Sequence, residues 1–154
     1  MTTSMGSENT PVPAQVLADA DATSDAVTGP EPGLILLIED DFMLRGSLAT
    51  LLDAEGYKVE SSANALDALQ RLDRPPKPSL ILLDIMLPYM DGLEFRAVQR
   101  RMRNIADIPV IVITAVGIRP EVANELGLET AFFKPLDPAR LLAAIRRLCP
   151  SGVS

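Results

Sequence analysis

The feature that most constrains the fold of this chain is a series of short, almost purely apolar runs. Each run is followed by a longer segment of helical periodicity. Three of these runs, Leu34–Ile38, Leu80–Leu83 and Pro109–Ile113, have the length of strands. They lack the alternation of apolar and polar residues that a half-exposed strand shows. An unbroken apolar run is typical of a strand buried on both faces of a parallel sheet. Two weaker candidates, Tyr57–Ser61 and Thr130–Phe133, bring the expected strands to five.

Helical segments follow these runs. After the first run, leucines recur at helical spacing until Gly56, a residue that commonly ends a helix. Helices are expected over residues 42–55, 64–72, 93–103 and 120–126, and from Asp137–Pro138 up to Pro150. Five strands alternating with five helices predict an α/β fold built on a doubly wound, five-stranded parallel sheet.

Composition divides the chain into three parts. Residues 1–33 contain five acidic residues and no basic one, so we expect a disordered acidic tail that cannot bury enough apolar surface to offset its ordering entropy. Residues 34–149 form the predicted domain, and 150–154 a short C-terminal end. Of the 21 acidic residues, 16 remain outside the tail against 14 basic ones, so most of the net charge of −7 lies on the tail.

The chain has no histidine and one cysteine. The first fact excludes Ser-His-Asp and Cys-His catalysis and histidine-ligated zinc. Cys149 alone cannot form an internal disulfide, which fits a reducing compartment. The acidic balance argues against a nucleic-acid partner, and no leader sequence or apolar run of the roughly 20 residues that span a bilayer is found. We therefore expect a cytoplasmic protein with no membrane partner.

Charged and hydroxyl side chains follow the expected strands where each strand ends. Glu39 and Asp40 come after the first strand, Asp84 after the third, Thr114 after the fourth and Lys134 after the fifth. Ligands of doubly wound folds bind at the carboxyl ends of the strands, near the switch in strand order. If the order is 2-1-3-4-5, the strands that carry these residues are neighbours and the side chains converge at one edge.

Such a set of residues suits phosphoryl transfer. Crowded carboxylates repel one another by about 1 kcal/mol per pair at 4 Å in water, a cost that a bound hard cation removes. Mg²⁺ takes oxygen ligands and leaves positions for phosphate oxygens. A lysine and a threonine can contact further phosphate oxygens, while one carboxylate acts as the nucleophile.

Four motifs with these residues resemble the receiver domain of bacterial two-component response regulators. They are Ile38-Glu39-Asp40, the segment from Leu83-Asp84 through Pro88 to Asp91-Gly92, Ile113-Thr114-Ala115 and Phe133-Lys134-Pro135. The resemblance covers residues 34–149 and implies the flavodoxin-like receiver fold with strand order 2-1-3-4-5. It also implies a cis peptide bond between Lys134 and Pro135.

The resemblance assigns a role to each motif residue. Asp84 would be the phosphoacceptor. Asp40, Asp84 and the backbone carbonyl of Met86 would bind Mg²⁺ directly, and Glu39 would bind it through water. Two further residues would contact the phosphoryl group: Thr114, which would reposition on activation, and Lys134.

The function implied is that of a single-domain response regulator, a signalling protein and not an enzyme. It would receive a phosphoryl group on Asp84 from a sensor histidine kinase or a histidine phosphotransfer protein. It would then act by phosphorylation-dependent docking on a downstream protein target or by phosphorelay. The alternative is a pseudo-receiver that is not phosphorylated and serves as a protein-interaction module. A flavodoxin-like cofactor binder is disfavoured, because the acids after the first strand would repel an anionic cofactor.

Some residues depart from the family pattern or have ordinary structural roles. Ala131 stands where receivers usually have the Tyr or Phe whose rotamer reports the movement of the threonine. The segment between Thr114 and Lys134 is short, which predicts a truncated fourth helix. Asp91 is expected to begin a helix, and Cys149 to be an inert packing residue. The arginines of residues 93–103 are expected on a solvated helix face; they are Arg96, Arg100, Arg101 and Arg103.

Overall fold

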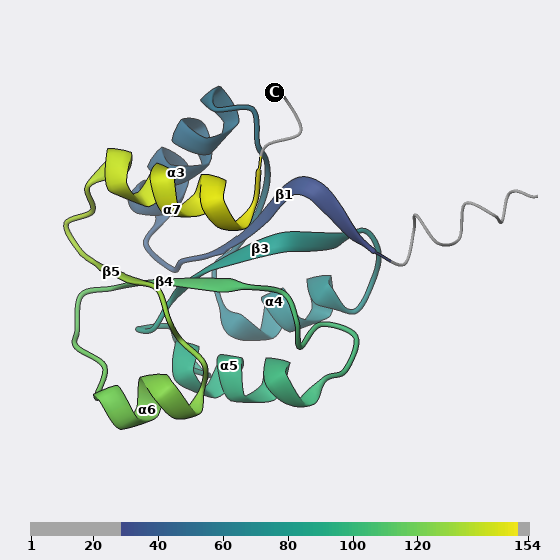
Figure 1. Cartoon of the computed structure of the whole chain (residues 1–154), viewed down its shortest axis with the longest axis vertical. Helices are drawn as coiled ribbons and strands as arrows, with labels where there is room; N and C mark the ends of the chain where they lie inside the picture. The colour runs from purple at the N-terminus through teal and green to yellow at the C-terminus, as the bar shows by residue number, and fades with distance from the viewer. Residues whose placement is uncertain (1–28, 151–154) are drawn as a thin grey trace, which may run out of the picture.

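A five-stranded parallel sheet lies between two layers of helices in the computed structural model of the chain, which describes residues 29–150 (Figure 1). The strand order is β2-β1-β3-β4-β5, so the fold class and strand order predicted from the sequence are confirmed. The strands are β1 (Pro30–Ile38), β2 (Lys58–Ser62), β3 (Lys77–Asp84), β4 (Val110–Thr114) and β5 (Ala131–Phe133). The helices are α3 (Phe42–Ala54), α4 (Ala65–Leu72), α5 (Gly92–Arg101), α6 (Pro120–Glu125) and α7 (Pro138–Leu148).

The three central strands each contain an unbroken apolar run, because both of their faces are covered there. On one face, Leu36 and Ile38 belong to a core formed with α4 and α5. On the other face, Ile35 and Leu37 pack in a second core with α3 and α7. All four side chains are at most 1% exposed. Figure 1 shows α3 and α7 on one side of the sheet and α4, α5 and α6 on the other.

The start of the sheet differs from the sequence-based prediction. β1 begins at Pro30 and not at Leu34, so the expected start of the first strand is four residues too late, while the division into tail and domain at 33/34 stays a prediction. Pro30 and Glu31 pair with the start of β3, and the pairing register shifts between Glu31 and Ile35. Gly33 lies in this shift with φ of 75°, a conformation that glycine adopts without steric cost. Residues 1–28 of the expected tail, and residues 151–154 of the expected C-terminal end, lie outside the described residues.

Local side-chain chemistry sets the beginnings of four helices. Asp41 caps α3 by accepting hydrogen bonds from the backbone N–H groups of Met43 and Leu44. Asn64, Asp91 and Asp137 cap α4, α5 and α7 in the same way, and Asp91 forms a full capping box with Glu94. No helix among residues 29–150 is long and apolar enough to span a membrane.

The burial of Cys149 agrees with the sequence-based prediction, whereas that of Arg96 does not. Cys149 is 1% exposed and packs in the core beneath α3 and α7, as expected. Arg96 does not lie on a solvated face, because it is only 8% exposed and its guanidinium donates to the backbone carbonyls of Leu126 and Gly127. The expectation of a solvated face was therefore wrong for Arg96. Arg100, Arg101 and Arg103 are exposed.

The segment between β4 and β5 is as short as the sequence predicts. Its helix, α6, has six residues and no buried side chain. The edge strand β5 has three residues, and Ala131 is exposed at its start.

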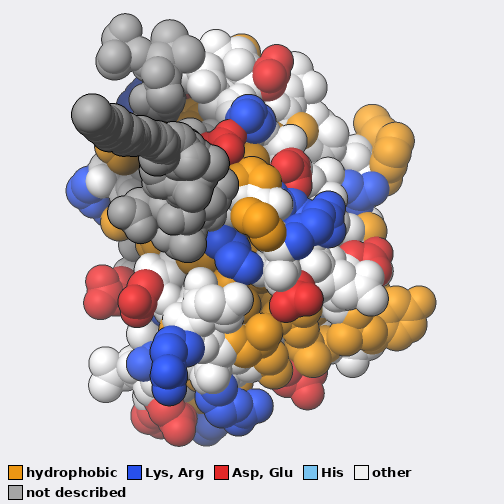
Figure 2. Space-filling model, turned by 90° about the vertical axis from the view of Figure 1, so that its right-hand side faces the viewer, with side chains coloured by type: hydrophobic (Ala, Val, Ile, Leu, Met, Phe, Trp, Pro, Cys, Tyr) orange, Lys and Arg blue, Asp and Glu red, His pale blue; other side chains and the backbone are white. Residues whose placement is uncertain are grey.

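Figure 2 shows the side of the molecule on which the chain enters β1, where basic and acidic side chains are interspersed.

Candidate functional site

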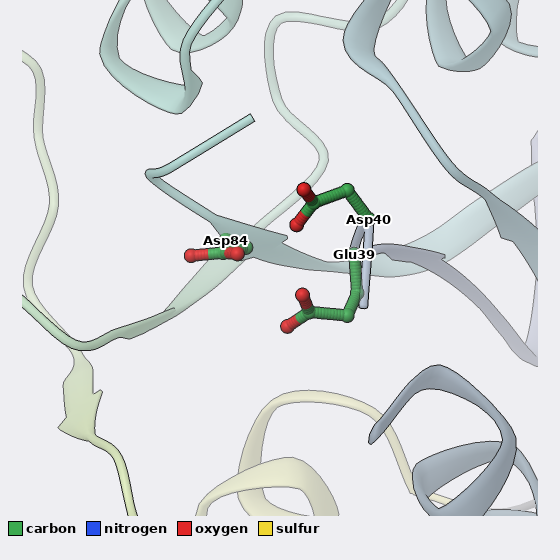
Figure 3. A group of neighbouring side chains, drawn as sticks. All are labelled: Glu39, Asp40 and Asp84. Atoms are coloured by element: carbon green, nitrogen blue, oxygen red, sulfur yellow. The ribbon is translucent and has the colours of Figure 1, made fainter. Parts of the chain in front are cut away.

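Three carboxylates meet where β1 and β3 end. Glu39 and Asp40 follow β1 directly, and Asp84 is the last residue of β3. The two strands are hydrogen-bonded neighbours with Ile38 opposite Leu83, so all three side chains emerge at the same edge of the sheet. One carboxylate oxygen from each residue lies within 4.8 Å of the others (Figure 3). Glu39 and Asp84 are buried, and Asp40 is exposed.

Asp84 is held by two contacts. Its Oδ1 accepts a hydrogen bond of 3.1 Å from the backbone N–H of Met86, and its Oδ2 accepts one of 3.3 Å from Lys134 Nζ. The residue is 1% exposed, and one of its carboxylate oxygens lies within 4.8 Å of those of Glu39 and Asp40. A buried carboxylate with a fixed orientation is suited to act as a nucleophile.

Gly92 lets α5 approach the backbone of Asp84. A Cβ atom at this position would lie 2.5 Å from the Asp84 carbonyl oxygen and 2.7 Å from Ile85 Cα, distances that real Cβ atoms essentially never show. The N–H of Gly92 donates to the carbonyl of Ile85 at 2.8 Å. The Asp91-Gly92 pair thus begins the helix with the aspartate and packs it against the candidate site with the glycine.

Lys134 joins the carboxylates from the fifth strand. Its Nζ lies 2.9 Å from Glu39 Oε1 and 3.3 Å from Asp84 Oδ2. Burial lowers the pKa of Lys134, but the hydrogen bonds and charges of Glu39 and Asp84 outweigh burial, so the pKa is raised and the side chain is cationic. The Lys134–Pro135 peptide bond is cis, as the family resemblance implied.

Glu39 carries the least satisfied oxygen of the site. Its Oε2 accepts a hydrogen bond from the backbone N–H of Asp41, whereas its buried Oε1 has no hydrogen-bond partner among residues 29–150 despite the nearby ammonium of Lys134. Burial raises the pKa of Glu39, and the charge of Asp84 adds to this effect against the opposing contacts of Asp41 and Lys134. Arg45, which the sequence analysis did not single out, donates to the backbone carbonyl of Glu39 at 2.7 Å.

Thr114 lies beside the carboxylates and is engaged elsewhere. It is the last residue of β4, is fully buried, and its carbonyl accepts a hydrogen bond from the N–H of Lys134. Its hydroxyl lies 3.1 Å from both the N–H and the carbonyl oxygen of Val116. The structure thus brings Thr114 to the site with its hydroxyl bonded within its own loop.

Met86 contributes its backbone to the site, since its N–H binds Asp84. Its side chain is 58% exposed, and that of Val116 is 39% exposed. The predicted role of the Met86 carbonyl as a metal ligand stays a prediction.

The chemistry of this donor set fits a hard divalent cation. Three carboxylates face one lysine, so the cluster carries an excess of negative charge when all are ionised. Glu39 Oε1 adds a buried carboxylate oxygen, with the ammonium of Lys134 at 2.9 Å. Oxygen ligands of this kind are those that Mg²⁺ prefers.

Comparison with known proteins places most of the chain in one family model, the response regulator receiver domain, which matches residues 35–146. The chain is 37% identical over 122 residues to a transcriptional regulatory protein, CpxR homolog, of Haemophilus influenzae, covering 78% of this chain and 52% of that protein. It is 35% identical over 119 residues to sporulation initiation phosphotransferase F of Bacillus subtilis, covering 75% of this chain and 93% of that protein. The chain thus spans about half the length of the first relative and nearly all of the second.

The solved structures include a close match to the fold. The signal receiver domain of a signal transduction histidine kinase from Syntrophus aciditrophicus superposes with a TM-score of 0.69 at 30% sequence identity. The match covers 79% of this chain and 92% of that chain.

Proposed function

The chain belongs to the response regulator receiver domain family, and on that basis we propose that Asp84 accepts a phosphoryl group in two-component signalling. The observation that carries the proposal is the setting of Asp84: a buried carboxylate with a lysine ammonium at 3.3 Å and two further carboxylates within 4.8 Å. An isolated buried acid would need only a counterion. The additional acids are expected where a cation and a phosphoryl group are bound together.

Glu39, Asp40, Asp84 and the Met86 carbonyl would hold Mg²⁺, with Glu39 acting through water. The ion, when bound, neutralises charge on the phosphoryl oxygens during transfer. The convergence of one carboxylate oxygen from each of Glu39, Asp40 and Asp84 supports this assignment, and Asp40 is exposed.

In the proposed reaction, an Asp84 carboxylate oxygen attacks the phosphorus atom of the donor. The new P–O bond forms as the bond between phosphorus and the donor's imidazole nitrogen breaks, and the electron pair of that bond returns to the imidazole. The acceptor oxygen needs no deprotonation when Asp84 is ionised. Lys134, held in place between Glu39 and Asp84, supplies a positive charge to the phosphoryl oxygens.

Thr114 would bind the phosphoryl group after a change of partner. Its hydroxyl now bonds to the backbone of Val116, and it must release at least one of these bonds to donate to a phosphoryl oxygen. Repositioning of Thr114 therefore releases hydrogen bonds that hold the loop that begins at Ala115, and we expect this loop to rearrange.

The proposed partners are proteins: a sensor histidine kinase or histidine phosphotransfer protein as donor, and a downstream protein target or relay partner. The relative that consists almost entirely of the matched region is named a phosphotransferase, which supports action through a receiver alone. DNA is not among the proposed partners, because residues 34–154 carry 16 acidic and 14 basic residues.

The experiment is phosphorylation of the intact protein by acetyl phosphate, followed by mass spectrometry. We expect one added phosphoryl group in the presence of Mg²⁺ and none in EDTA or in Asp84→Asn. The matched control, Asp91→Asn, keeps a capping side chain and should be labelled like the parent. A parent that takes no phosphoryl group under any condition would instead support the alternative of an unphosphorylated interaction module.

A further inference from the structure

The two ends of α6 are attached to the rest of the protein in very different ways. At its N-terminal end, the cap residue Arg119 makes no side-chain capping hydrogen bond, and residues 115–117 before it are exposed. No side chain of the helix is buried. The beginning of α6 is therefore held by packing of the partly buried Ile118 on the core and by no side-chain capping hydrogen bond, and it follows the loop that begins at Ala115.

The C-terminal end of α6 has a complete set of hydrogen bonds. Gly127, with φ of 66°, donates to the carbonyl of Asn124, and Leu128 donates to that of Ala123. This pattern is the Schellman motif, in which a left-handed glycine closes a helix. Leu128 is 7% exposed and belongs to the core on this side of the sheet.

Two arginines of α5 add to this end. Arg100 donates to the carbonyl of Glu125 at 2.7 Å, and Arg96 donates to the carbonyl of Leu126 at 2.9 Å. These carbonyls form the negative end of the helix dipole, where a cation is favourable. No carboxylate within residues 29–150 forms an ion pair with Arg96, so backbone carbonyls and one amide supply its acceptors.

The amide acceptor of Arg96 is the side chain of Gln99, which also binds the segment that precedes β4. Gln99 is fully buried; its Oε1 accepts from Arg96 at 2.8 Å. Its Nε2 donates to the carbonyls of Ile105 and Ile108 at 2.9 and 3.0 Å. The guanidinium of Arg96 is thus held by Gln99, whose own side chain is held by backbone carbonyls of buried residues. Figure 1 shows α5 and α6 side by side on the same face of the sheet.

We propose that Arg96 and Arg100 hold the C-terminal end of α6 as a pivot, about which a rearrangement at Thr114 swings the N-terminal end. The pivot rests on the proposed function, since the rearrangement is the one that phosphorylation of Asp84 requires. Without the two arginines, the movement spreads along the whole helix and into the turn before β5. The orientation of α6 after phosphorylation would then no longer be fixed, although Asp84 still reacts.

The test is residue-resolved amide hydrogen exchange by NMR on the full chain. In the unphosphorylated protein, Arg96→Met should raise the exchange rates of Leu126, Gly127 and Leu128 by about tenfold, because a buried charged donor is lost. Arg100→Met, at an exposed position that does not threaten folding, should raise them less. The control Arg101→Met changes an exposed arginine of the same helix and should leave them unchanged. The amide of Leu36 in β1, a buried residue of a strand that is distant in the sheet from β5, reports global stability and corrects for any general destabilisation.

The second arm adds Mg²⁺ and acetyl phosphate. In the parent, exchange should change at residues 115–121 and stay constant at 126–128, whereas in Arg96→Met it should change at both. Equal changes at both ends of α6 in the parent would overturn the pivot, as would exchange in Arg96→Met that matches Arg101→Met. A parent that takes up no phosphoryl group contradicts the proposed function instead, while the unphosphorylated comparison still decides whether the arginines hold the helix.

Discussion

Replacing Asp40 by Asn removes one of the three charges that meet at the ends of β1 and β3. Asp40 is exposed, and its carboxylate lies within 4.8 Å of those of Glu39 and Asp84. Two unit charges at that distance repel by about 0.9 kcal/mol in water, so the two pairs together cost about 1.8 kcal/mol. Lys134 and salt offset part of this repulsion. We therefore expect Asp40→Asn to stabilise the metal-free protein by about 1 kcal/mol, or about 3 °C in melting temperature.

Magnesium should remove that advantage. At a concentration about 100 times its dissociation constant, an ion that binds only the folded state stabilises it by about 2.7 kcal/mol. If Asp40→Asn binds the ion tenfold more weakly, Mg²⁺ stabilises the variant by about 1.4 kcal/mol less than it stabilises the parent, so the variant is no longer the more stable protein. Thermal melts in EDTA and across a Mg²⁺ titration measure both quantities.

The matched control for this prediction is Asp41→Asn, one residue along the chain. Asp41 caps α3 and lies outside the carboxylate cluster, and Asn caps about as well as Asp. It should leave the Mg²⁺-dependent rise of the melting temperature unchanged. An Asp40→Asn protein that melts well below the parent in EDTA, or that gains as much from Mg²⁺ as the parent does, would refute the electrostatic reasoning.

Two further changes test the surroundings of Asp84. Gly92→Ala places a methyl group against the Asp84 carbonyl, so it should lower the free energy of unfolding by about 2 kcal/mol and slow phosphorylation. The control Gly46→Ala has nothing within 4 Å of the added Cβ atom, so it should leave stability and phosphorylation intact or stabilise α3 slightly. Denaturant melts and labelling rates compare the two variants. The exposed apolar side chains Met86 and Val116 cannot orient an attacking water, so phosphorylated parent should persist longer than a Met86→Asn, Val116→Glu double variant when decay is followed by mass spectrometry. Equal or faster decay of the parent would show that these positions do not control access of water.

The sequence predicted those parts of the fold that depend on neighbouring residues. The capping roles of Asn64 and Asp91 follow from side chains that reach the backbone three residues on. The doubly covered strands were visible as unbroken apolar runs such as Leu34–Ile38. The order of the strands came from the resemblance to a known family, since apolar periodicity does not by itself order strands in a sheet.

The missed features depend on contacts between distant residues. Arg96 binds carbonyls 30 and 31 residues away, and only the packing of α5 on α6 shows that its side chain is buried. The start of β1 at Pro30 depends on pairing with Lys77, so composition alone placed it in the tail. The engagement of the Thr114 hydroxyl by Val116 is a property of loop conformation, which the residue types do not specify.

Locating the phosphoryl group within the chain tests the central claim most directly. Protein treated with acetyl phosphate and Mg²⁺ is digested, and the peptides are sequenced by mass spectrometry under conditions that preserve acyl phosphates. We expect a single phosphorylated residue, Asp84, in the peptide that contains the end of β3. A phosphoryl group on Asp40, on Asp91 or on a hydroxyl such as Thr114, with Asp84 unmodified, would contradict it.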